Sequence, residues 1–190
     1  MTVFDAVACG LAGLPVAYLL LVAWPLARID LREHRLPNAL TLPGLWLALA
    51  GQTLASLVLA LRGLVDQGRD WPEVLGAAFA NQAGALVVAA VVFAFSLAAH
   101  VWAGLGMGDV KLLTVIALSL GWFSPWSPLL AVVVGLATAV VVVVTRFAMG
   151  RIKLNAAMAL GPYLLVGFAV AALVLGAGAF VGAPAMNLVS

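Results

Sequence analysis

The chain has 190 residues, of which 66% are hydrophobic and 8% charged, and its mean hydropathy is +1.22. Soluble domains carry about 25% charged residues, so this composition predicts a membrane protein with several spans. Nine basic and seven acidic side chains give a net charge of only +2, which argues against nucleic-acid binding. The single cysteine, Cys9, excludes an internal disulfide and a zinc site built on paired cysteines.

Six apolar stretches follow one another along the chain, and all but the fourth are near the length that a helix needs to cross about 30 Å of hydrocarbon. Their expected bounds are 6–27, 39–61, 75–99, 110–123, 129–149 and 156–181. Asp5 rather than basic side chains precedes the first stretch, so we do not expect a cleavable signal peptide. The longest polar connection runs from Arg62 to Glu73. The sequence therefore predicts an all-α membrane bundle of six transmembrane helices, with residues 1–190 forming a single domain.

The distribution of lysine and arginine predicts the orientation, because these residues resist translocation across the membrane. The first, third and fifth loops hold seven of the nine, namely Arg28, Arg32, Arg35, Lys111, Arg146, Arg151 and Lys153. The second loop holds Arg62 and Arg69, and the termini and the fourth loop hold none. We therefore expect the odd-numbered loops in the cytoplasm and both termini outside.

The fourth stretch follows a glycine-rich turn that carries an acidic side chain, Gly106-Met107-Gly108-Asp109-Val110-Lys111. Fourteen residues make only about 21 Å of helix, which is less than the hydrocarbon thickness, so Asp109 is predicted to lie below the membrane surface. An ionisable side chain at such a depth is expensive and marks a functional site. Asp30 ends the first apolar stretch on the same predicted side. Two carboxyl groups could therefore meet across the bundle.

These motifs resemble those of the type IV prepilin peptidases, which are aspartic membrane proteases of the GxGD class. In that family one catalytic aspartate precedes a short basic loop that ends in Pro-Asn, and the other lies in Gly-x-Gly-Asp-x-Lys. Asp30 with Pro37-Asn38 matches the first pattern, and residues 106–111 match the second. A Gly-Pro-aromatic turn that opens the last span is matched by Gly161-Pro162-Tyr163, although Ala159 replaces a proline that is frequent shortly before it.

The resemblance implies an endopeptidase in which Asp30 and Asp109 activate water, one as general base and the other as general acid. Two such carboxyl groups in a poorly solvated site resist double ionisation, so the pair is expected to titrate as a unit. The implied supporting residues are Gly106, Gly108, Lys111, Pro37, Asn38, Gly161 and Pro162. The resemblance further implies no cofactor, prepilin or pseudopilin substrates with short basic leaders, and a plasma-membrane location with the site facing the cytoplasm.

Three other interpretations of the sequence remain open. Archaeal preflagellin peptidases share a related core. A proton-linked transporter also explains carboxyl groups in a membrane, but transporters place them near the midplane between related halves, whereas these acids are expected in loops on one side. A noncatalytic scaffold for pilus assembly does not require both aspartates.

Larger bacterial members of the family add a methyltransferase region with paired CxxC motifs. Because this sequence has neither, the resemblance implies a form with peptidase activity alone.

Several polar residues have structural interpretations. Lys111 either biases the acid pair toward ionisation, fixes the loop by bonding backbone carbonyls, or extends to the membrane interface. Asn81 and Gln82 are expected to form hydrogen bonds between helices rather than to contact a substrate. No metal site is expected, since the only histidines, His34 and His100, are separated by two predicted spans. We interpret His34 as a solvated loop residue and His100 as an interface residue.

Overall fold

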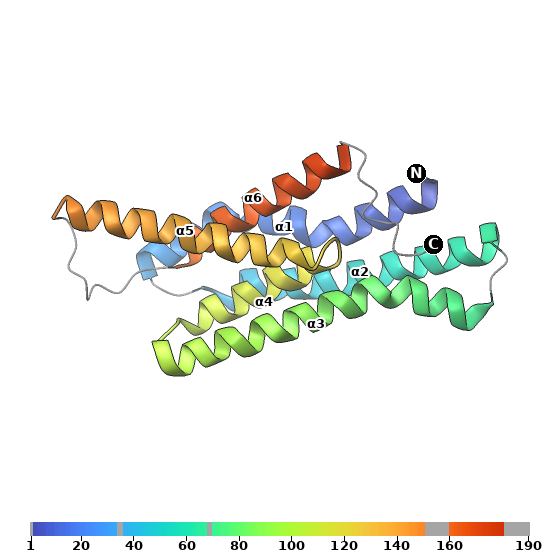
Figure 1. Cartoon of the computed structure of the whole chain (residues 1–190), viewed down its shortest axis with the longest axis horizontal. Helices are drawn as coiled ribbons and strands as arrows, with labels where there is room; N and C mark the ends of the chain where they lie inside the picture. The colour runs from blue at the N-terminus through green and yellow to red at the C-terminus, as the bar shows by residue number, and fades with distance from the viewer. Residues whose placement is uncertain (1, 34–35, 68–69, 151–159, 181–190) are drawn as a thin grey trace.

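The computed structural model describes residues 2–33, 36–67, 70–150 and 160–180 of the chain. Within these residues it contains six helices and no strand (Figure 1). The helices are α1 (Val3–Glu33), α2 (Asn38–Gln67), α3 (Trp71–Ala103), α4 (Met107–Gly121), α5 (Trp126–Ala148) and α6 (Gly161–Phe180). By length and composition, α1, α2 over Asn38–Val65, α3 and α5 can each cross a membrane. The prediction of an all-helical membrane bundle is confirmed.

The first three helices extend beyond their predicted spans at both ends, and α4 begins at Met107, earlier than predicted. These differences change where the candidate acids lie. Asp30 is within α1, and Asp109 is the third residue of α4. Both acids therefore lie on helix ends, whereas the sequence analysis expected them in loops. Arg62 belongs to α2, which continues to Gln67, instead of to the second loop. The reason is that a hydropathy window ends at the first charges, whereas backbone hydrogen bonding continues through charged residues until a capping signal stops it.

Some expectations concern residues that the structure does not describe. These are the ends of the sixth span at 156 and 181, together with His34, Arg35, Arg69, Arg151, Lys153 and Ala159. The beginning of α6 is described, and Gly161 is its first residue, so the Gly-Pro-aromatic turn opens this helix as predicted.

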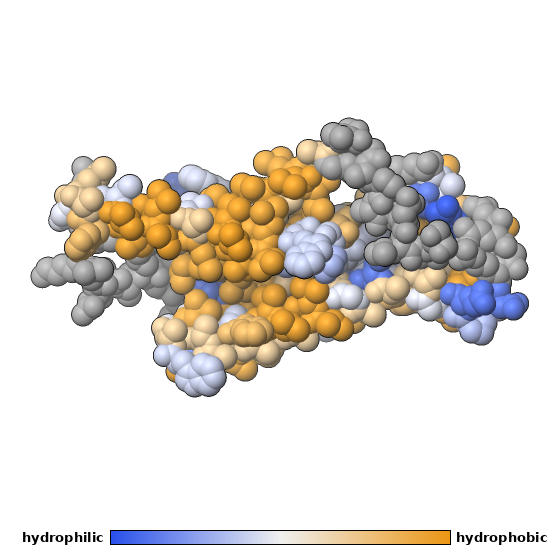
Figure 2. Space-filling view, in the orientation of Figure 1, coloured by the Kyte–Doolittle hydropathy of each residue, from blue (hydrophilic) through white to orange (hydrophobic). Residues whose placement is uncertain are grey.

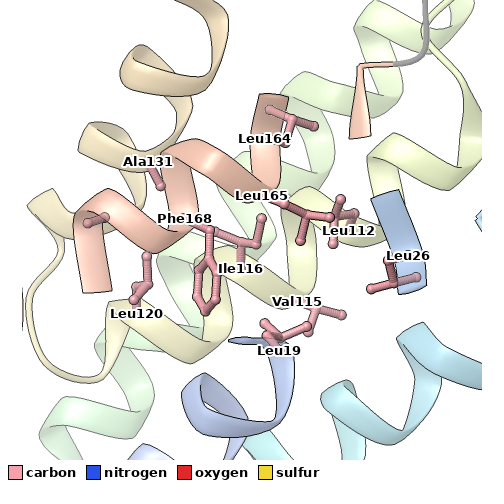
Figure 3. Packing of buried hydrophobic residues seen from close by; sticks show 11 residues of the cluster. Leu19, Leu26, Leu112, Val115, Ile116, Leu120, Ala131, Leu164, Leu165 and Phe168 are labelled. Atoms are coloured by element: carbon pink, nitrogen blue, oxygen red, sulfur yellow. The ribbon is translucent and has the colours of Figure 1, made fainter. Parts of the chain in front are cut away.

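The short helix α4 forms the centre of the bundle and contacts each of the other five helices. Ten of its 15 residues are buried, which is the expected environment for a helix that is apolar on most sides. Figure 3 shows Leu112 and Ile116 of α4 packed with Leu165 and Phe168 of α6, and Leu19 of α1 beside them. This packing holds the beginning of α4 in place relative to α1 and α6.

The far end of α4 lies inside the bundle. The turn between α4 and α5 lies about midway along the long axis of the molecule, whereas α1, α2 and α3 continue toward the N-terminal end (Figure 1). The fully buried side chain of Gln52 in α2 donates its amide N–H to the carbonyl oxygen of Leu118, at 2.7 Å. The last four carbonyls of a helix have no donor within the helix, and that of Leu118 is one of them. This hydrogen bond therefore stabilises the C-terminal end of the short helix α4. The depth of Asp109 below a membrane surface stays a prediction.

Two further polar contacts join helices in the part of the bundle distant from the acids. Gln82 of α3 donates to the hydroxyl of Thr53 in α2 at 2.9 Å, which confirms its predicted interhelical hydrogen bond. Asp5 of α1 pairs with Arg62 of α2 and also accepts a hydrogen bond from the backbone N–H of Thr2 at 2.8 Å. Figure 2 shows hydrophobic colour over the visible faces of α5 and α6, whereas hydrophilic colour gathers toward the end of the molecule where α2 and α3 meet.

Candidate active site

A cavity of about 290 Å³ lies where α1 ends and α4 begins. Its lining residues are Asp30, Leu36, Gly106, Met107, Gly108, Asp109 and Lys111. Asp30 and Asp109 are 5% and 8% exposed, and the two carboxyl groups are close enough to interact electrostatically. Because a water molecule occupies about 30 Å³ of liquid volume, the cavity has room for several waters beside the carboxyl groups. The structure thus brings the two predicted acids together.

Asp30 is held by the beginning of α6. Its Oδ2 accepts a hydrogen bond of 3.1 Å from the backbone N–H of Gly161. The beginning of a helix carries free N–H groups and a partial positive charge, and both favour a carboxylate there. Pro162 follows in the first turn, where its missing N–H breaks no intrahelical bond. A Cβ atom on Gly161 would lie 2.6 Å from Oδ2 of Asp30, so the close approach requires glycine.

Asp109 lies in the first turn of α4, and the two glycines of its motif serve different contacts. Gly106 is the residue that caps the helix, and its carbonyl accepts the backbone N–H of Asp109 at 3.0 Å. A Cβ atom on Gly106 would lie 3.1 Å from Oδ2 of Asp109. A Cβ atom on Gly108 would lie 2.9 Å from Cβ of Leu36, so this glycine lets the segment after α1 approach α4. The glycine spacing therefore shapes both walls of the cavity.

The end of α3 sets the direction of the chain as it enters the cavity. Gly104 adopts a left-handed conformation with φ of +70°, and the N–H of Leu105 returns to the carbonyl of Ala99 at 3.3 Å. A ring nitrogen of His100 also contacts the carbonyl oxygen of Leu105. Sequence reasoning treated His100 as an interface residue and missed this contact. The signal was Gly104, because a glycine there marks the left-handed end of a helix that His100 is close enough to cap.

Lys111 joins α4 to α2. Its Nζ donates a hydrogen bond of 2.9 Å to Oδ1 of Asn38, the first residue of α2. The preceding residue, Pro37, accepts the backbone N–H of Leu40 at 3.1 Å through its carbonyl oxygen, which fixes the beginning of α2. Lys111 therefore connects the segment that follows Asp30 with the helix that carries Asp109. This contact supports the loop-fixing interpretation of Lys111, with a side-chain amide as acceptor.

The part of the chain that the structure describes contains no group of side chains suited to bind a metal ion. There, no three histidine, cysteine, aspartate or glutamate side chains lie close enough together to hold an ion. The charged groups that line the cavity are the two carboxyl groups and the ammonium group of Lys111.

The structure therefore describes an apolar helix bundle of a membrane protein with two buried carboxyl groups in one cavity. Residues 16–145 match the type IV leader peptidase family, and the chain belongs to this family. The resemblance that the motifs predicted is therefore confirmed. The matched range includes both aspartates and ends before Gly161, so the contact between α6 and Asp30 comes from the structure alone.

Two curated relatives are named prepilin leader peptidase/N-methyltransferase and come from Burkholderia pseudomallei strains 1026b and K96243. Each is 31% identical to this chain over 146 residues. The alignments cover 75% of this chain and 40% of each relative, so the chain matches less than half the length of these proteins. No solved structure matches the chain.

Proposed function

We propose that this protein is a membrane-embedded aspartic endopeptidase that removes the short leader from prepilin-like proteins. The observation that carries the proposal is the cavity in which Asp30 of α1 and Asp109 of α4 lie together, both largely shielded from solvent. Membership of the leader peptidase family and the name of the two relatives, prepilin leader peptidase/N-methyltransferase, support the same substrate class. An apolar bundle around the acids suits a substrate that carries an apolar segment of its own.

The proposed reaction needs only the two carboxyl groups and water. One carboxylate takes a proton from water as the water oxygen bonds to the peptide carbonyl carbon, and the other, protonated, donates to the carbonyl oxygen. The C–N bond then breaks as the departing amine receives the proton that was taken from water, and a hydroxyl of the tetrahedral intermediate returns its proton to the other carboxylate, which restores the pair. Burial of both groups next to each other favours one proton shared between them. The N–H of Gly161 on Asp30 holds one of the two in a fixed direction.

The proposed location is the plasma membrane, with the aspartates at the cytoplasmic end and both termini outside. Among the described residues, Arg28, Arg32, Lys111 and Arg146 lie on helix segments at the aspartate end of the bundle. Arg62 lies toward the other end, where it pairs with Asp5. This asymmetry agrees with the retention of basic residues in the cytoplasm. A leader with basic residues would approach the acidic cavity from that side.

The test is to co-express the protein with candidate prepilins and follow leader removal by mass shift. Asp30→Asn and Asp109→Asn keep the side-chain shape but remove the acid–base function, so each should lower the cleavage rate by about 10²–10⁴-fold. Asp70→Asn is the matched control, because Asp70 is exposed and its side chain makes no capping hydrogen bond. Full processing by either site variant, at normal membrane levels, would overturn the two-aspartate proposal.

A further inference from the structure

The connection between α3 and α4 consists of three residues, Gly104, Leu105 and Gly106. The two helices lie side by side and run antiparallel, so this connection joins the C-terminal end of α3 to the first turn of α4 (Figure 1). Gly106 lines the aspartate cavity, and Asp109 follows it in the first turn of α4. Because the connection is so short, its conformation determines where that first turn lies.

The last turn of α3 holds both polar groups of the Leu105 backbone. The N–H of Leu105 donates to the carbonyl of Ala99 at 3.3 Å, and the carbonyl oxygen of Leu105 contacts Nδ1 of His100. A carbonyl oxygen can only accept, so Nδ1 of His100 is the donor and carries the proton in this contact. Packing at Gly104 adds no such support among the described residues, because a Cβ atom there would meet no atom within 4 Å.

The contacts continue from Leu105 to Asp109. The peptide group is planar, so the direction of the Leu105 carbonyl also sets the position of the Gly106 nitrogen. The carbonyl of Gly106 then accepts the backbone N–H of Asp109 at 3.0 Å and that of Val110 at 3.2 Å. Glycine has the widest choice of backbone conformations, and Leu105 lies between two glycines. A contact that fixes Leu105 therefore removes conformational freedom that would otherwise reach the first turn of α4.

We propose that His100 is a positioning residue for Asp109, and this inference rests on the proposed function. Its ring N–H holds the connection in the conformation that directs the Asp109 carboxyl group into the cavity it shares with Asp30. Among the described residues, those that line the cavity do not include His100, so it acts through the backbone. A displacement of about 1 Å in a reacting group can lower a rate about 10²-fold. Loss of the ring N–H should therefore lower kcat more than it changes KM, because a misdirected acid affects the chemical step.

The kinetic test compares two variants of His100. His100→Phe keeps an aromatic ring without a donor and should lower kcat for a full-length prepilin about tenfold, with KM within about twofold of the wild type. His100→Asn places an amide N–H at the position of Nδ1 and should keep kcat within about threefold of the wild type. Ser96→Ala is the control, because it removes a hydrogen bond of 3.0 Å from Ser96 to the carbonyl of Phe93 within α3, and it should change neither value. A normal kcat in His100→Phe, or equal losses in His100→Phe and His100→Asn, would overturn the inference.

Amide hydrogen exchange tests the positioning without relying on cleavage. The N–H groups of Leu105 and Asp109 are both hydrogen-bonded, so their exchange reports on the connection. In bilayer vesicles, the peptide that contains residues 105–109 should exchange about tenfold faster in His100→Phe than in the wild type, and at about the wild-type rate in His100→Asn. Equal exchange in the three proteins would refute the inference, whatever their cleavage rates. Lack of leader removal by the wild-type protein is a separate result, which counts against the proposed function while the exchange still reports on His100.

Discussion

The backbone N–H of Gly161 donates a hydrogen bond of 3.1 Å to the carboxyl group of Asp30, a residue 131 positions earlier in the chain. This bond attaches the beginning of α6 to the last turn of α1 and sets the direction of one of the two acids. It also explains why a glycine opens α6, because any larger residue would occupy the space of the carboxyl oxygen.

The substitution Gly161→Ala should impair activity far more than stability. The added Cβ would lie 2.6 Å from Oδ2 of Asp30, and this oxygen is the end of a side chain that can rotate away. Folding then changes little, but the carboxyl group leaves its position, and a displacement of about 1 Å can lower the rate about 10²-fold. The rate of leader removal and the melting temperature in detergent check the two parts. Gly13→Ala in α1, with no atom within 4 Å of the new Cβ, is the control.

The substitution Gly167→Ala, in contrast, should impair stability far more than activity. Its Cβ would lie 2.0 Å from the carbonyl oxygen of Ala131 and 2.6 Å from the backbone nitrogen of Gly135. Backbone atoms cannot move aside unless α5 and α6 separate, so the free energy of unfolding should fall by at least about 2 kcal/mol. Denaturant titration in micelles measures this loss. Gly176→Ala on the same helix has open space and should be neutral or stabilising, and equal stability of the two variants would contradict the packing.

The contact between Lys111 and Asn38 predicts non-additive effects on activity. Lys111→Met and Asn38→Ala each remove the 2.9 Å hydrogen bond that connects α4 with the beginning of α2. Each should lower kcat, and the double variant should be little worse than the stronger single one, with a coupling energy of about 0.5–3 kcal/mol. Single-turnover cleavage rates of the four proteins complete the cycle. Strictly additive losses would show that the two residues act independently.

Removal of the charge of Asp5 should lower stability and leave the chemistry intact. Asp5 is 6% exposed and accepts hydrogen bonds from Thr2 and Arg62 at the end of the bundle away from the cavity. Asp5→Asn weakens these bonds, and hydrogen bonds to a charged group contribute about 1.5–3 kcal/mol. The melting temperature should fall, while kcat of the folded protein stays within twofold of the wild type. Lost activity in a fully folded Asp5→Asn protein would show that this end of the bundle affects the catalytic site.

The proposed orientation predicts opposite labelling at the two ends of the bundle. In a Cys9→Ser background, one cysteine replaces Glu33, the last residue of α1, and another replaces Asp70, the residue before α3. Both positions are exposed, and they lie near opposite ends of the bundle. A membrane-impermeant maleimide added to intact cells should label Asp70→Cys and spare Glu33→Cys until the cells are opened. The reverse pattern would place the aspartates outside the cytoplasm.

The sequence predicted the helices better than their ends. Hydropathy identified all six helices, because lipid requires apolar side chains and internally bonded backbone. It misplaced Arg62 and both acids as loop residues, since charge ends an apolar stretch but does not end a helix. Gly104 was the available signal for the end of α3, and its left-handed φ of +70° agrees with that role.

The candidate site was predictable as residue types but not as contacts. Asp109 with its two glycines and Asp30 before Pro37-Asn38 could be read as a two-acid pattern from the chain alone. That Lys111 bonds Asn38, and that Gly161 bonds Asp30, could not, because each contact joins helices whose mutual placement depends on packing around α4.

The residues of the chain are enough to predict a set of apolar helices with two acids at the borders of the apolar stretches, because composition decides whether a segment prefers lipid to water. That these acids share one cavity, and that α6 supplies an N–H to one of them, followed only from how the helices pack. The physical reason is that close approach depends on which helix faces meet, and here glycines at the contacts let backbone and side chains come together.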